Sequence, residues 1–130
     1  MNRKILLLII GILIFSNCKE KNEIEYSFVD VQINKSNYYL TLPAGITKNK
    51  VDHYEEGFIQ QFIYSDKSYV IILRGGNADL ELPNSDNAEI HSRYESVDRI
   101  QMVYGNVKSE RKEEFDRAFD LMKVNGIKKK

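Results

Sequence analysis

The fold of this chain is decided by residues 57–73, GFIQQFIYSDKSYVIIL. In residues 57–64 the two phenylalanines fall on one face of an extended chain and the two isoleucines on the other, which predicts a strand. Residues 69–73 form an unbroken apolar run, which is typical of a central strand covered on both sides. The short polar connection at 65–68 therefore predicts an antiparallel hairpin.

A second hairpin is predicted upstream. Residues 26–33 and 38–42 both alternate apolar and polar side chains, as strands with one buried face do. The connection between them, NKSN at 34–37, consists of residues that favour turns. Pro43 is expected to end the second strand, because proline cannot donate a hydrogen bond to the ladder.

A further strand and a helix are predicted downstream. Residues 99–104 alternate as a strand does, and Gly105-Asn106 is expected to end it. Ser109 has the chemistry of a helix N-cap, and Asn125-Gly126 should stop the helix. The apolar residues at i, i+3, i+4 and i+7 make one stripe that should pack on the sheet; they are Phe115, Ala118, Phe119 and Met122.

These elements predict an α+β fold, an antiparallel sheet of about five strands with a C-terminal helix packed on one face. A single domain is expected at 25–127, followed by a basic, solvated tail at 128–130.

Residues 77–97 are the least periodic part of the domain, and they are acidic. A loop of this length is unusual in a compact domain, so it should either serve a function or contain a short strand or helix near 89–97. Loops on a rigid scaffold commonly bind, and a solvated loop is the alternative. The candidate partner-binding residues are Asp79, Glu81, Asp86 and Glu89.

Composition excludes several classes of function. The 130 residues include 19 Lys and Arg and 19 Asp and Glu. Removing residues 1–17, which hold Arg3 and Lys4 and no acid, leaves 17 basic against 19 acidic residues. A near-neutral domain lacks the basic footprint of a nucleic-acid-binding protein. Cys18 is the only cysteine, which excludes an intrachain disulfide and a thiolate zinc site.

The N-terminus has the pattern of a secretory signal. Arg3 and Lys4 precede the apolar run ILLLIIGILIF at 5–15. As a helix this run would be roughly 16 Å long, too short for the ~30 Å bilayer core, and its length suits the apolar region of a signal peptide.

The residues after the run indicate which signal it is. Phe15-Ser16-Asn17-Cys18 resembles a relaxed form of the lipobox of bacterial lipoproteins, with Phe15 and Asn17 in place of the usual leucine and small residue. The resemblance implies that residues 1–17 are a cleaved signal peptide and that 18–24 are a lipidated cysteine, Cys18, with a charged spacer. The protein would then be anchored to the bacterial cell envelope, in the outer membrane by analogy. An uncleaved anchor or another signal is the alternative. The domain resembles small periplasmic PsbP/Mog1-like lipoprotein domains in architecture only.

Candidate chemistry is sparse. His53 and Glu55 have the i, i+2 spacing of strand metal ligands, but a third ligand would have to come from elsewhere, such as His91. Residues 52–56 are therefore expected to be a solvated loop, and no metal or cofactor is expected. Arg74-Gly75-Gly76-Asn77 indicates a turn, because it lacks the Lys-Ser/Thr of a phosphate-binding loop.

Three functional hypotheses remain. The leading one is a lipid-anchored, non-enzymatic envelope domain that binds a protein partner, as an accessory or an immunity or inhibitor factor whose acidic loop faces a basic surface. The second is a small-ligand binder with a cavity between sheet and helix. The third is a small hydrolase-type enzyme, although no Gly-x-Ser-x-Gly elbow is present and lipidation would remove Cys18 as a nucleophile.

Overall fold

The computed structural model describes residues 26–75, 80–125 and 127–129. The predicted signal peptide, the predicted lipidation site Cys18 and the candidate partner-binding residue Asp79 lie outside these ranges. The described elements are, in order, β1 (Phe28–Gln32), β2 (Tyr38–Pro43), β3 (Ile46–Tyr54), β4 (Gly57–Tyr64), β5 (Tyr69–Gly75), β6 (Ile90–Val97), β7 (Ile100–Lys108), α2 (Ser109–Asn125) and β8 (Lys128–Lys129).

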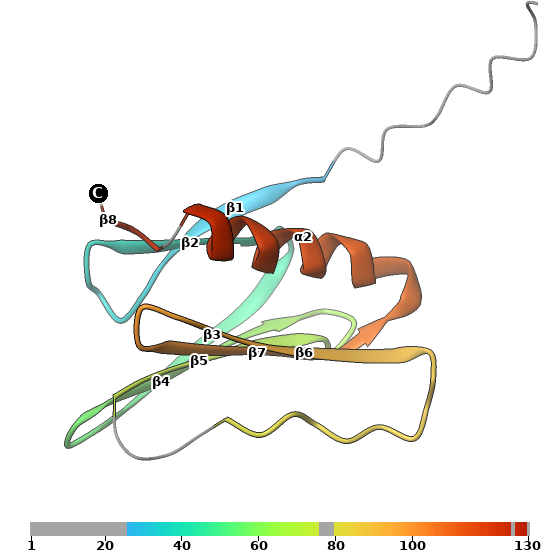
Figure 1. Cartoon of the computed structure of the whole chain (residues 1–130), viewed down its shortest axis with the longest axis horizontal. Coiled ribbons are helices and arrows are strands. Elements are labelled where there is room, and N and C mark those ends of the chain that lie inside the picture. Colours follow the sequence, from blue (N-terminus) through green and yellow to red (C-terminus); the bar gives the residue numbers. More distant parts are fainter. Residues whose placement is uncertain (1–25, 76–79, 126, 130) are drawn as a thin grey trace, which may run out of the picture.

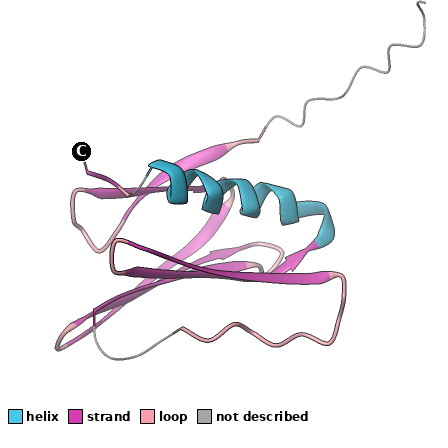
Figure 2. Cartoon of the chain, viewed as in Figure 1, coloured by secondary structure: helices cyan, strands magenta, loops and turns pink. Residues whose placement is uncertain are grey.

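The predicted α+β architecture is confirmed. An antiparallel sheet of five strands has the order β3-β4-β5-β7-β6, and a smaller antiparallel sheet has the order β1-β2-β8. Helix α2 and the small sheet lie on one side of the large sheet, and segment 80–89 runs along its other side (Figures 1 and 2). The predicted hairpin of residues 26–42 therefore belongs to a separate, smaller sheet instead of adding two strands to the large sheet.

The decisive hairpin forms as its sequence predicts. Strands β4 and β5 pair from Gly57 with Gly75 to Ile63 with Tyr69. Strand β5 is central, with β4 on one side and β7 on the other. Val70 and Ile72 face α2 and are fully buried, and Leu73 is buried on the opposite face. The central position of the β-branched run is thus confirmed.

The core lies between the large sheet and the layer formed by α2 and the small sheet. All four residues of the predicted helical stripe are buried. The ring of Tyr104 on β7 packs edge-to-face against Phe115 and Phe119, with centroids 5.5 and 5.1 Å apart. Tyr64 packs in the same way against Phe115, at 5.1 Å. Such edge-to-face contacts add to the apolar burial that holds the helix on the sheet.

One strand was not predicted, and the end of another differs from prediction. Residues 46–54 form the edge strand β3, so Asp52 and His53 lie on a strand and only Glu55-Glu56 form the turn. Most of β3 is exposed and polar, which removes the apolar alternation by which a strand is recognised. Strand β7 also continues through Gly105-Asn106 to Lys108. Asn106 has a positive φ of 55° near an irregularity in the β6–β7 pairing, so the strand bends there without ending.

Two further elements bear on the predictions. The element expected near residues 89–97 is strand β6, which pairs along β7 at the edge of the large sheet. The expected tail residues Lys128 and Lys129 instead pair with Tyr39 and Tyr38 as β8. No helix in the described part of the chain is long and apolar enough to cross a membrane.

Candidate binding surface

The face of the large sheet that points away from α2 is only partly covered. We call this the open face. In an antiparallel sheet, paired residues point to the same side, so the register places Ile59, Ile71 and Tyr94 on it. Ile59 is 36 % exposed and Tyr94 is 38 % exposed, while Ile71 is half-buried. The open face therefore presents apolar side chains to solvent on β4, β5 and β6.

Segment 80–89 covers part of the open face, on the side of β7 and β6. The backbone N–H of Leu80 donates to the side-chain oxygen of Gln101 on β7, at 2.9 Å. The hydroxyl of Ser92 on β6 donates to the carbonyl of Pro83, at 3.3 Å. The segment thus lies over β7 and β6.

The described acidic residues of this segment point into solvent. Glu81, Asp86 and Glu89 are all exposed, and none makes an ion pair with a described residue. Beside Glu81 lies Leu82, which is 54 % exposed. Segment 80–89 therefore adds free negative charge and a large apolar side chain to the open face. The sequence indicated the acids, but Leu82, Ile59 and Tyr94 emerge only from the structure.

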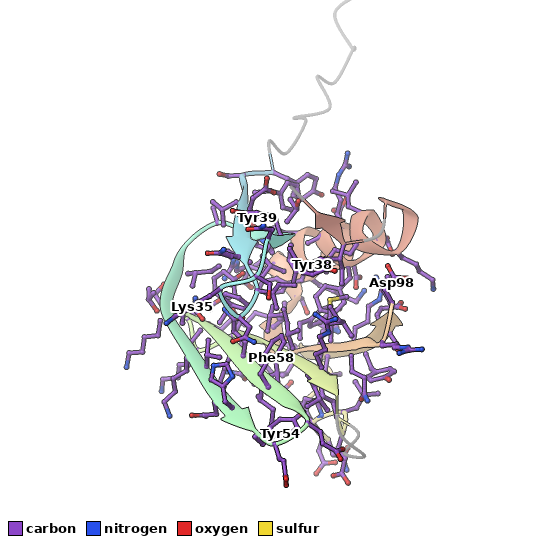
Figure 3. All side chains as sticks on the ribbon, turned by 90° about the vertical axis from the view of Figure 1, so that its left-hand side faces the viewer. Lys35, Tyr38, Tyr39, Tyr54, Phe58 and Asp98 are labelled. Carbon is purple, nitrogen blue, oxygen red and sulfur yellow. The ribbon has the colours of Figure 1, made fainter. Side chains whose placement is uncertain are left out.

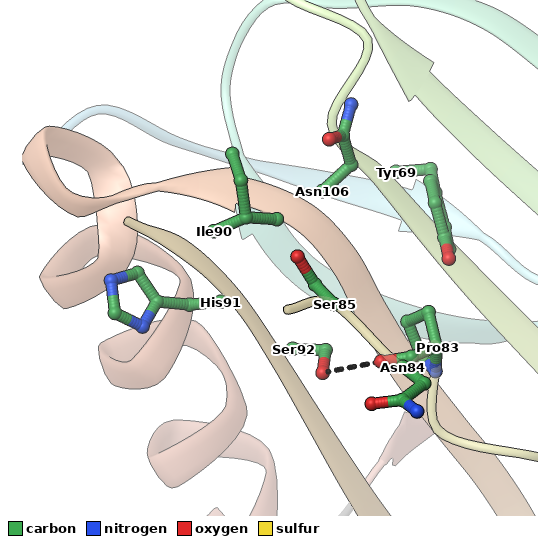
Figure 4. A pocket seen from close by; sticks show the side chains of 8 residues that line it. All are labelled: Tyr69, Pro83, Asn84, Ser85, Ile90, His91, Ser92 and Asn106. Carbon is green, nitrogen blue, oxygen red and sulfur yellow. Dashed lines mark hydrogen bonds between the residues drawn. The ribbon is translucent and has the colours of Figure 1, made fainter. Parts of the chain in front are cut away.

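A cavity of about 230 Å³ opens between segment 80–89 and the sheet (Figure 4). Its lining is mostly uncharged and comprises Tyr69, Pro83, Asn84, Ser85, Ile90, His91, Ser92 and Asn106. The Tyr69 hydroxyl has no hydrogen-bond partner among the described residues, and burial raises the pKa of this group. A neutral polar group or a small partner side chain would suit this lining.

His91 braces the start of the helix. Its Nε2 atom lies 2.9 Å from the hydroxyl of Ser109, the first residue of α2. That hydroxyl also donates to the carbonyl of Glu89 at 3.3 Å. Because no carboxylate among the described residues orients the imidazole, the pair lacks the third group of a nucleophile–base arrangement.

The suggested joining of His53 and His91 in a metal site is wrong. His53 lies on β3 and His91 on β6, which are the two opposite edges of the large sheet. Among the described residues, no group of three His, Cys, Asp or Glu side chains is close enough to hold a metal ion.

Arg93, on the helix-facing side of the large sheet, is held in ion pairs that the sequence did not reveal. Arg93 on β6 contacts Glu95 at 2.7 Å, Asp120 at 2.7 Å and Asp116 at 3.3 Å. Hydrogen bonds from Arg93 lower the pKa of Glu95. Such networks tie strand to helix and are structural.

The contact between sheet and helix is filled by aromatic rings. Tyr64, Tyr104, Phe115 and Phe119 are each 2 % exposed or less. A ligand cavity at this place would require these side chains to move. The accessible candidate sites are therefore on the open face and at the turns. This chain matches no protein-family model, no curated protein and no solved structure at a significant level.

Proposed function

We propose that this chain is a lipid-anchored, non-enzymatic accessory of the bacterial envelope that binds a protein partner through the open face of its large sheet. One observation carries the proposal: solvent-exposed Leu82, Ile59 and Tyr94 lie on the same face as the unpaired acids of segment 80–89. Protein interfaces combine an apolar centre with a polar rim in this way. The matching partner would carry an apolar patch bordered by Lys and Arg, as expected of an immunity or inhibitor factor facing a basic protein.

The anchor is supported by the sequence around Cys18, the single cysteine of the chain. Two or three acyl chains on one residue would hold the domain durably, because each buried methylene contributes about 0.8 kcal/mol. Mass spectrometry of the mature N-terminus, with Cys18→Ala alongside, tests this. We expect an acylated Cys18 at the N-terminus and loss of the variant from the membrane fraction. An unmodified Cys18 would overturn the anchor and leave the binding proposal standing.

The binding face can be mapped before the partner is identified. A photo-crosslinking residue placed at Leu82 or at Tyr94 should trap one partner species in intact cells. The same residue at Val29 on β1 or Leu121 on α2 is the matched control, because these side chains are 38 % and 37 % exposed on other surfaces. Equal crosslinking at all four positions would contradict docking on the open face.

The charge of the partner can be tested on the same complex. Glu81→Lys with Glu89→Lys should weaken the crosslink to the partner and remove its sensitivity to salt, since exposed charges act mainly on association. Glu110→Lys changes an exposed acid at the start of α2 and should leave the crosslink unchanged. Stronger crosslinking after reversal at Glu81 and Glu89 would indicate an acidic partner instead.

Small-ligand binding in the cavity beside Tyr69 is the second candidate function. At about 230 Å³ the cavity is smaller than the ~300–1,000 Å³ typical of ligand pockets. Its volume thus fits one side chain of a docked protein better than a free metabolite. Binding of a polar metabolite that is lost in Tyr69→Phe, with no crosslinked protein, would favour this candidate.

A further inference from the structure

The turns of the two sheets converge at one end of the molecule, on the left in Figure 1. The β1–β2 turn, the β3–β4 turn, the end of β5 and the β6–β7 turn meet there. Figure 3 views this end directly, with Phe58 near the centre, Tyr38 above it and Asp98 to one side. A groove of about 340 Å³ lies here, and we call it the Arg74 groove. Its lining includes Asn34, Glu56, Phe58, Arg74 and Arg99.

The backbone of two glycines lines part of the Arg74 groove, and we call this part its floor. Gly57 and Gly75 line it side by side, as a register pair of β4 and β5. A Cβ atom at Gly75 would overlap the carbonyl of Glu56. The hydroxyl of Tyr54 donates to the carbonyl oxygens of Arg74 and Gly75, at 3.1 and 2.9 Å. These contacts hold the floor in one conformation.

One wall is fixed by a buried glutamine. The backbone N–H of Asn34, in the β1–β2 turn, donates to the side-chain oxygen of Gln60 at 2.9 Å. Gln60 belongs to β4 and is 1 % exposed, so this bond fastens the turn to the large sheet. The groove is therefore formed before any ligand arrives, which limits the entropy lost on binding.

Two cationic side chains line the groove without a carboxylate partner. The Arg74 guanidinium lies 5.5 Å from the centre of the Tyr38 ring, and among the described residues neither Arg74 nor Arg99 forms an ion pair. By contrast, Arg93 and Arg111 are each held by at least two acids. Stacking on Tyr38 holds the Arg74 fork in place and leaves its N–H donors available.

We infer that the Arg74 groove binds a small ligand or a chain end through one oxyanion, a carboxylate or a phosphate, held by Arg74 and Arg99. A guanidinium presents two parallel N–H donors that match the oxygens of either group. Arg99 is held in a tight turn with Asp98, both with positive φ (64° and 51°), which fixes where its side chain starts. The carboxylate of Glu56, which also lines the groove, repels a second negative charge on the ligand. The site therefore prefers one oxyanion to a polyanion.

Titration of the full chain in detergent tests the inference, with backbone amide NMR signals as the readout. Acetate and inorganic phosphate are the two probes, with sodium chloride at equal ionic strength as the blank. We expect saturable shifts at the amides of Gly57, Gly75 and Arg99 for at least one probe. The probe that saturates at lower concentration identifies the oxyanion.

Variants separate binding from general charge effects. Arg74→Gln and Arg99→Gln should each weaken binding at least about tenfold, because a charge-assisted hydrogen bond is lost. Arg117→Gln is the matched control: Arg117 also stacks on a tyrosine ring, Tyr26 at 5.2 Å, but lies on α2 outside the groove. Glu56→Gln should strengthen binding, because it removes a like charge.

The binding test remains informative if Arg74→Gln fails to fold. Arg99 is exposed in a turn, so Arg99→Gln should keep the wild-type spectrum elsewhere and can stand alone. Non-saturating shifts, shifts confined to other surfaces, or equal losses in Arg117→Gln and Arg99→Gln would overturn the assignment. None of these measurements uses the open face, so failure here leaves the proposed function untouched.

Discussion

The side chain of Gln60 joins the two sheets, because its Oε1 atom accepts the backbone N–H of Asn34 at 2.9 Å. Its Nε2 atom donates to the carbonyl of Gln32 at 3.2 Å and to the Oδ1 atom of Asn49 at 2.9 Å. Gln60 lies on the apolar face of β4, between Phe58 and Phe62, and is 1 % exposed. A buried amide is tolerated there because both of its polar atoms are paired.

Replacing this glutamine should loosen the small sheet. Gln60→Leu keeps a similar volume but leaves the N–H of Asn34 and the carbonyl of Gln32 without their partner. We expect a loss of about 2–3 kcal/mol in the free energy of unfolding, measured by urea denaturation. Gln61→Leu is the control, because Gln61 is half-buried on the opposite face and outside this network. Equal losses in both variants would show that the hydrogen bonds contribute little.

The ion pairs of Arg93 predict how the free energy of unfolding depends on pH. Hydrogen bonds from Arg93 lower the pKa of Glu95 below its ordinary value. Burial raises the pKa of the Asp116 carboxyl, but hydrogen bonds from Lys112, Tyr104 and Arg93 outweigh this and leave that pKa lowered. A carboxyl with a lowered folded pKa contributes stability above its unfolded pKa, and that stability is lost as pH falls through the folded value.

We therefore expect the urea midpoint to be steady from about pH 7 to 5 and to fall below about pH 4.5, where the unfolded carboxyls take up protons. Arg93→Gln should lower the urea midpoint at pH 7. It should also make the fall of the midpoint in acid less steep, because Glu95 and Asp116 then lose a shared hydrogen-bond donor. Arg117→Gln, which alters an arginine without an ion pair among the described residues, should keep the wild-type slope. An unchanged slope in Arg93→Gln would contradict the role of this network.

The sequence predicted the elements whose burial follows a regular period. The β4–β5 hairpin and the stripe from Phe115 to Met122 are apolar at the spacing of their own structure, so each is visible without knowledge of the fold. Strand β3 was missed because it is an edge strand whose stability comes from pairing with β4. Its residues Lys48 and Lys50 face water. Charged side chains on an edge strand prevent pairing with other chains. They also give the strand the polar composition of a loop.

The candidate surfaces were predictable only in part. The acids of segment 80–89 stood out by composition, but the apolar side chains beside them come from three different strands and a loop. The sequence placed Arg74 in a predicted glycine turn. Arg99, which lines the same groove, lies 25 positions later in the chain. The β5–β7 register, which pairs Arg74 with Ile100, brings the two arginines to one groove. Such proximity depends on strand order, which no local pattern contains.

Two glycines with positive φ should respond differently to alanine. Gly45 has a φ of 92° and open space around the position of a Cβ, so Gly45→Ala should cost only backbone strain, about 1–2 kcal/mol. Gly75 has a φ of 78°, and a Cβ there would also overlap the Glu56 carbonyl. Gly75→Ala should therefore destabilise the fold more than Gly45→Ala in urea denaturation. Equal costs would mean that the two strands can move apart at the floor of the Arg74 groove.

Gly105 should control how segment 80–89 lies on the open face. It sits on β7, and a Cβ there would overlap the end of the Tyr69 ring and come within 2.9 Å of the Pro83 side chain. Its φ is not in the positive region, so Gly105→Ala adds bulk without backbone strain. The added methyl must push away either the Tyr69 ring or the segment. Because residues 80–89 form neither a helix nor a strand, we expect the segment to yield.

Limited proteolysis measures this displacement. In Gly105→Ala, cleavage within residues 80–89 should become several-fold faster, while cleavage in the β1–β2 turn at 34–37 keeps its wild-type rate and serves as the internal control. Gln101→Ala removes the acceptor of the Leu80 N–H and should release the same segment without adding bulk. If both variants expose the segment and both also lose the crosslink at Leu82, the position of segment 80–89 governs partner binding. A Gly105→Ala variant that is cleaved like the wild type would mean that the Tyr69 ring moves and the segment stays.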